Sequence, residues 1–103
     1  MTVTIPASGN ALVTLTLGSS TSATDLDCLM AFAVSGATTR VSSDAQSFRN
    51  PGRSVANAVH QGSATYLVTG LTAGSNTFTA QYRLGTAGTC TFLNRNIIVI
   101  PLP

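Results

Sequence analysis

The sequence predicts an all-β fold, an antiparallel β-sandwich of jelly-roll type formed by one domain over residues 1–103. Two observations support this prediction. Apolar and polar residues alternate in short segments, which is typical of strands with one buried face. Gly, Ser, Asn or Pro stands at every segment boundary, roughly each eight to twelve residues, as in the turns of sandwiches and jelly rolls.

The N-terminal part contains two such segments. Thr2–Ile5 alternates and stops at Pro6, which cannot donate a hydrogen bond to a β-ladder. Ala11–Leu17 places Val13 and Leu15 on one face and threonines on the other. Both segments are predicted to be strands, the second with one face in the core.

The segment Asp27–Ser35 is apolar on both faces. A helix is the alternative, because Leu, Met and Ala favour helices, but so short a segment without caps makes a poor helix. As a strand it needs only one face for the core. We therefore predict that the second face contacts another subunit, through Leu29, Ala31 and Ala33.

The last third predicts four strands, of which the first three are separated by glycine-containing turns: Ala64–Thr69, Ser75–Leu84, Thr89–Phe92 and Asn96–Ile100. The final strand carries consecutive β-branched residues, which are either buried on both faces or exposed and adhesive on one. We assign Ile98 and Ile100 to an oligomer interface. The prolines that follow prevent pairing with another chain beyond the end of the strand.

The charge content is low: the chain has no lysine or glutamate, and 8% of its residues are charged, against about 25% in typical domains. Neutral polar side chains or other protein must therefore cover the surface, so we predict a protein that assembles. The net charge is +2, but the arginines are scattered without aromatic neighbours. This pattern argues against nucleic-acid binding.

The N-terminus has neither the basic start nor the apolar run of a signal peptide. No segment approaches the ~18 apolar residues of a membrane span. We expect cytoplasmic synthesis without a signal peptide, and no membrane insertion.

Cys28 and Cys90 are too few for a disulfide framework. Each lies in an alternating apolar segment, so we favour two buried thiols, with a single cross-strand bridge as the alternative. A metal or redox role is disfavoured because no second Cys or His lies at ligand spacing from either one.

Gly36–Gln61 is the least patterned stretch, and long connections in compact domains are often functional loops. A ligand or specific partner is expected to bind here. The residues assigned to this partner loop are Arg40, Phe48, Arg49, Arg53 and His60.

Catalytic and metal-binding groups are sparse. Asp25 and Asp27 could offer oxygens to calcium, but turn-forming aspartates in a loop are the better interpretation. His60 and Asp44 could be combined with a serine into a triad, but no nucleophile-elbow motif accompanies them. We predict no enzyme activity, no cofactor and no metal.

Three sequence segments are similar to a known domain, and the similarity extends over nearly the whole chain: ALVTLTLG, CLMAFAVSGATT and VTGLTAGSNTFTAQYRLGTAGTCTFLNRNIIVIPL. They resemble a small jelly-roll domain of actinobacterial proteins and their phages, similar to the tumour-necrosis-factor and complement globular-head superfamily. The resemblance implies a ten-stranded jelly roll that packs as a homotrimer about an axis lined by apolar strand faces. The shared motifs are structural and carry no chemistry.

Domains of this kind often hang from a stalk, and no stalk sequence accompanies this one. The expected function is therefore a structural virion protein, a trimeric capsid decoration protein of a phage that binds the major capsid protein or another virion protein. The alternative is a receptor-binding module that recognises a host protein or glycan. Arg83 and Arg95 are expected either to pair with aspartates of a neighbouring subunit or to cover apolar neighbours with their stems.

Overall fold

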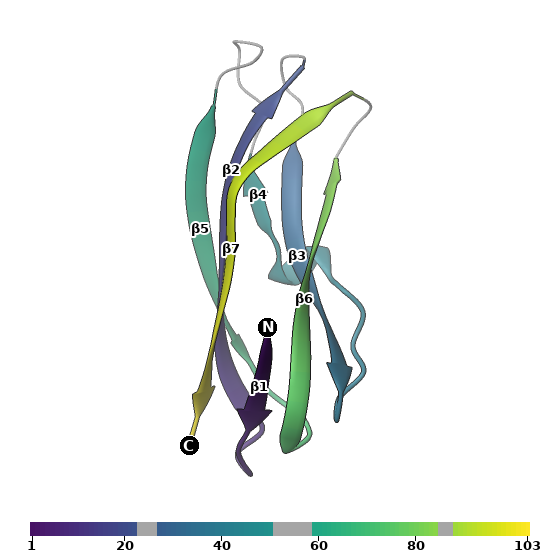
Figure 1. Cartoon of the computed structure of the whole chain (residues 1–103), viewed down its shortest axis with the longest axis vertical. Coiled ribbons are helices and arrows are strands. Elements are labelled where there is room, and N and C mark those ends of the chain that lie inside the picture. The colour runs from purple at the N-terminus through teal and green to yellow at the C-terminus, as the bar shows by residue number, and fades with distance from the viewer. Residues whose placement is uncertain (23–26, 51–58, 85–87) are drawn as a thin grey trace.

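The computed structural model describes residues 1–22, 27–50, 59–84 and 88–103, which form two antiparallel sheets packed as a β-sandwich (Figure 1). One sheet has the order β1-β6-β3-β4 and the other β5-β2-β7. The elements are β1 (Thr2–Ile5), β2 (Asn10–Thr21), β3 (Cys28–Gly36), the 3₁₀ helix η1 (Asp44–Gln46), β4 (Phe48–Asn50), β5 (His60–Val68), β6 (Gly74–Leu84) and β7 (Cys90–Leu102). This arrangement confirms the predicted all-β class. Within the described ranges, no helix has the length and hydropathy needed to cross a bilayer.

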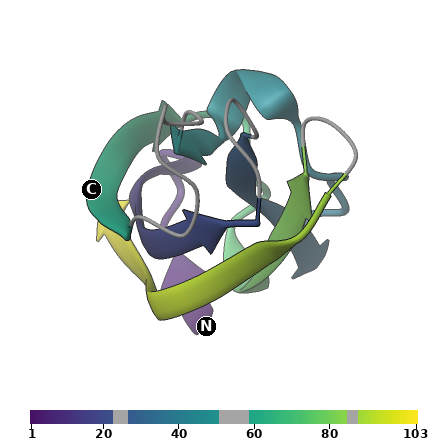
Figure 2. The ribbon, with the colours of Figure 1, turned by 90° about the horizontal axis from the view of Figure 1, so that it is seen from above.

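The core lies between the two sheets, and the strands surround it when the molecule is seen along its long axis (Figure 2). Alternation along β2 and β3 supplies most of it, because every second side chain of a strand points to the same face. The rings of Phe32 and Phe78 lie 5.9 Å apart between neighbouring strands β3 and β6. The buried members from β2 and β3 are Ala11, Val13, Leu15, Leu17, Met30, Phe32 and Val34. The strand interpretation of Asp27–Ser35 is thus confirmed over the helix.

The C-terminal segment forms one strand, not the two that we predicted. Asn94 adopts a positive φ of 48°, and the pairing of β2 with β7 shifts register between Thr16 and Gly18. A β-bulge at this point accommodates polar residues without ending the ladder. Asn94 and Arg95, which fall between the two predicted strands, are therefore the site of a bulge.

The predicted loop Gly36–Gln61 contains structure that its sequence does not signal. η1 follows the N-cap Ser43, whose hydroxyl accepts from the backbone N–H of Ala45. β4 then pairs with the start of β3, Phe48 opposite Met30. A three-residue strand is too short to show alternation, which explains the missed element. Asp25 and Arg53 lie outside the described residues.

Cys28 and Cys90 form a disulfide bond, with their Cα atoms 6.0 Å apart. The favoured prediction of two free thiols was wrong, and the alternative bridge is the one that forms. Cys28 opens β3 in the larger sheet and Cys90 opens β7 in the smaller one. The bond therefore joins the two sheets covalently at one end of the sandwich.

Asn76 is a fully buried polar residue that ties three backbone segments together. Its side-chain oxygen accepts from the N–H of Thr38 at 2.9 Å. Its amide donates to the carbonyl oxygens of Thr72 and Gly74, at 2.9 and 3.1 Å. These bonds hold the connection after β3 against the turn before β6.

Replacement Asn76→Ala is expected to lower the free energy of unfolding by about 2–3 kcal/mol, since it leaves buried donors and acceptors without partners. Urea unfolding measures this as a lower midpoint with an unchanged slope. Thr79→Ala, at an exposed position of the same strand, is the control and should change stability by less than about 0.5 kcal/mol. Equal effects of the two variants would contradict this role for Asn76.

Candidate functional site

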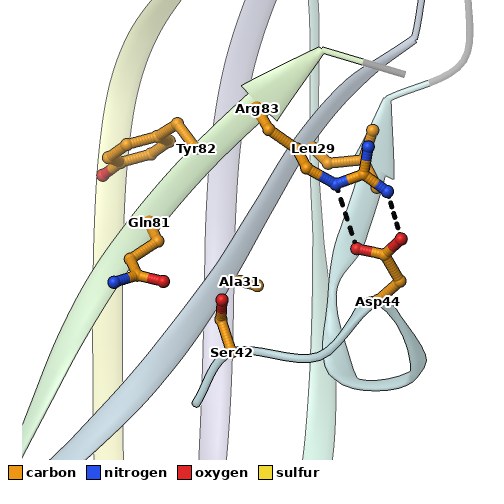
Figure 3. A pocket seen from close by; sticks show the side chains of 7 residues that line it. All are labelled: Leu29, Ala31, Ser42, Asp44, Gln81, Tyr82 and Arg83. Atoms are coloured by element: carbon orange, nitrogen blue, oxygen red, sulfur yellow. Dashed lines mark hydrogen bonds and ion pairs between the residues drawn. The ribbon is translucent and has the colours of Figure 1, made fainter.

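A pocket of about 290 Å³ opens on the outer face of the four-stranded sheet (Figure 3). β3 supplies an apolar floor, while β6 and the segment before β4 supply polar walls. The ring of Tyr82 points away from the other side chains that line this pocket (Figure 3). The lining residues are Leu29, Ala31, Ser42, Asp44, Gln81, Tyr82 and Arg83.

The floor residues were predicted to contact another subunit. Leu29 is 1% exposed and Ala31 9% exposed in the single chain, and Ala33 is half-buried. The second apolar face of β3 is thus largely covered within the single chain, and Ser42 and Asp44 of the segment before β4 lie over it. A strand that is apolar on both faces does not require a second subunit when a later segment of its own chain folds over it.

An ion pair between Asp44 and Arg83 closes one side of this pocket. Arg83 Nε donates to Asp44 Oδ1 at 3.1 Å, and Arg83 Nη2 donates to Asp44 Oδ2. Both side chains are about half exposed. The hydrogen bond from Arg83 lowers the pKa of Asp44, and the same bond raises the pKa of Arg83. Arg83 therefore already has a partner within its own chain, and the pair fastens η1 to β6.

This ion pair predicts a small dependence of stability on pH. The pKa of Asp44 is lower in the folded state than its ordinary value of 3.8, so the pair stabilises the fold above that value. The contribution is lost as the pH falls through the lowered pKa. The melting temperatures of the native protein and Asp44→Asn should differ modestly at pH 6, less at high salt, and the difference should shrink as the pH falls through the lowered pKa. A difference that stays the same from pH 6 down to strongly acidic pH would contradict the assignment.

The outer face of the smaller sheet carries exposed apolar side chains. Leu67 of β5, Leu12 of β2 and Ile100 of β7 stand in register across the three strands, and Ile98 lies beside Thr14 in the next row. We call these four residues, Leu12, Leu67, Ile98 and Ile100, the apolar face. Leu67, Ile98 and Ile100 are 57%, 42% and 51% exposed. Among the consecutive β-branched residues of β7, Val99 is therefore buried, whereas Ile98 and Ile100 face outward.

An aromatic cluster lies where β6 and β7 approach each other. The rings of Tyr82 and Phe92 are 5.1 Å apart, and the guanidinium of Arg95 stacks over Tyr82 with 5.4 Å to the ring centroid. Such a contact is favourable for an arginine on an exposed strand. Arg95 has no carboxylate partner among the described residues.

The described residues of the predicted partner loop make contacts within the chain. Arg40 donates to the Thr69 carbonyl oxygen at 3.1 Å, and Arg49 pairs with Asp27 at 3.3 Å. His60 is half-buried in β5. Phe48 packs against the core, and a Cβ atom added at Gly62 would lie 2.8 Å from its ring. Instead, Ser42 and Asp44 are the loop residues that line the pocket, and sequence reasoning did not assign them to it.

The side chains that could bind a metal do not cluster in the described residues. In the parts of the chain that the structure describes, no three His, Cys, Asp or Glu side chains gather as a metal site would require. No family model, curated protein or solved structure matches this chain. The fold and its surfaces therefore define its class: an antiparallel β-sandwich with an uncharged apolar outer face and a polar pocket on the opposite sheet.

Proposed function

We propose that the protein is a structural component of a virus particle without enzymatic activity, a homotrimer that decorates the capsid surface of an actinobacterial phage. The apolar face is the observation that carries this proposal. Exposed Leu67 and Ile100 stand on either side of half-buried Leu12 in one row, and such a run of apolar side chains is typical of a surface that another protein covers. Burial of such surface contributes about 25 cal/mol per Å² before the costs of association.

The strand order supports the finer proposal of a jelly roll. A jelly roll is a long hairpin rolled up, so its strands pair in a nested series. Here β3 pairs with β4, β2 with β5 and β1 with β6, which is such a series. The superfamily resemblance and the apolar face together favour a trimer, with Ile98 and Ile100 toward the three-fold axis.

The decoration role is tested on the particle. Purified protein is added to expanded shells of the phage that encodes it, shells prepared without this protein. We expect saturable binding to the major capsid protein at a whole number of trimers per shell, and genome release at a higher temperature. Failure to bind the shell, together with binding to the tail or to host cells, would refute the role.

A receptor-binding role is the second candidate, and the pocket favours it. Ser42, Gln81 and the ion pair of Asp44 with Arg83 surround an apolar floor, a combination suited to a small polar ligand such as a sugar. Cell binding that is lost on Gln81→Ala but retained on Thr79→Ala would favour this role over decoration.

A further inference from the structure

β7 has an unpaired edge that the nested pairing leaves open. β7 is hydrogen-bonded only to β2. Parts of β1 and β6 in the other sheet approach β7, but no strand of the described residues pairs with its second edge. β7 runs along most of the molecule's length (Figure 1) and contains 13 residues. Of the other edge strands, β1 spans four residues and β4 three. β5 is bonded to the segment around β4, through Asn50 to the His60 carbonyl oxygen and through Tyr66 to that of Ser47.

Pro101 indicates which backbone groups face this edge. Its backbone nitrogen has no hydrogen to donate. Proline is therefore tolerated in a strand where this nitrogen points away from the neighbouring strand. Backbone groups of alternate residues point to the same side of a strand. The N–H and C=O groups of Ile97 and Val99, in phase with Pro101, therefore point away from β2 and toward the open edge.

This edge lacks most of the features that protect free strands from pairing. Edge strands are usually blunted by charge, proline, bulges or shortness. In β7 the bulge at Asn94 and the proline at Pro101 lie on either side of Asn96–Ile100, and that stretch contains neither charge nor proline. β-branched side chains fill four of its positions, which favours extended pairing.

We propose that the open edge of β7 accepts an extended segment of a partner protein as an added strand, one that alternates apolar side chains and carries a carboxylate beside Arg95. The positive charge of Arg95 is the reason for proposing a partner segment that carries a carboxylate. Arg95 is exposed, has no carboxylate partner among the described residues, and is the single charged residue of β7. A second copy of β7 would offer no carboxylate. Main-chain hydrogen bonds supply affinity in such strand addition, and side chains supply selectivity.

This inference goes beyond the proposed decoration role and does not depend on it, because the edge consists of the backbone groups of Ile97 and Val99, whereas the apolar face consists of side chains. The probe is an eight-residue synthetic peptide that alternates valine and threonine and has one aspartate in place of a central threonine. Matched peptides carry lysine instead of aspartate, or N-methyl groups on alternate residues. Amide hydrogen exchange of the full chain is followed at Ile97 and Val99.

We expect the aspartate peptide to slow exchange at both amides, the lysine peptide to bind about two- to fivefold more weakly, and the N-methylated peptide to have no effect. Arg95→Glu should reverse the preference between aspartate and lysine. The inference is overturned if no peptide slows exchange at 1 mM, if both amides are already protected in the dilute protein, or if protection rises with protein concentration alone. The last result would assign the edge to a second copy.

Discussion

Reduction of the disulfide between Cys28 and Cys90 is expected to lower the free energy of unfolding by about 4 kcal/mol. The two cysteines are 62 positions apart, and closing a loop of that size restricts the unfolded chain by about this amount in the chain-entropy description. Small domains have a total stability of about 5–15 kcal/mol, so the loss is a large fraction of it. Urea unfolding with and without a reductant measures the difference.

The double variant Cys28→Ala with Cys90→Ala is the matched control, because it removes the bond chemically. It should lose a similar amount of stability in oxidising buffer and show no further change when the reductant is added. A native protein whose unfolding midpoint does not respond to reductant would contradict the bridge as a source of stability.

Replacement Ile98→Asp is expected to convert the proposed trimer into monomers, with association weakened at least about a hundredfold. A carboxylate placed in an apolar interface loses its hydration without gaining a partner, and each 1.4 kcal/mol lost is about a factor of ten. Ile98 is 42% exposed in the single chain, so the folded monomer should tolerate the change. Light scattering over a hundredfold range of concentration gives the mass.

Thr79→Asp is the control for this experiment, because it adds the same charge at an exposed position of the other sheet. It should leave the trimer intact. If the native protein is a monomer throughout the concentration range, the apolar face does not drive self-association. If both variants dissociate the trimer, the interface lies elsewhere.

The strands were predictable where turn residues mark both ends of an alternating segment, whereas β2 continues to Thr21, past its predicted end at Leu17. β1 matches its predicted bounds, and β3 and β6 match to within one residue, because turns and alternating side chains mark both their ends and their faces. β7 was divided in two because a run of polar residues looks the same in sequence whether it forms a turn or a bulge. The bulge depends on the partner strand, which local sequence does not specify.

The site was less predictable because it depends on contacts between distant segments. Nothing near Cys28 in the sequence indicates that Cys90 will lie beside it, and free thiols and a bridge look alike in an alternating segment. Arg83 and Asp44 are separated by 39 positions, and their pairing requires the fold of the segment before β4. By contrast, the outward direction of Ile98 and Ile100 follows from period-two alternation with a buried Val99.

The disulfide also limits how far the chain can be stretched. A pull on the two termini can unravel only residues 1–27 and 91–103, because the covalent link carries the load past everything between the cysteines. Fully extended, those outer segments reach roughly 140 Å, against roughly 360 Å for the whole chain. Under tension the extension of the oxidised domain is therefore limited to these outer segments, and β3 to β6 do not carry the force.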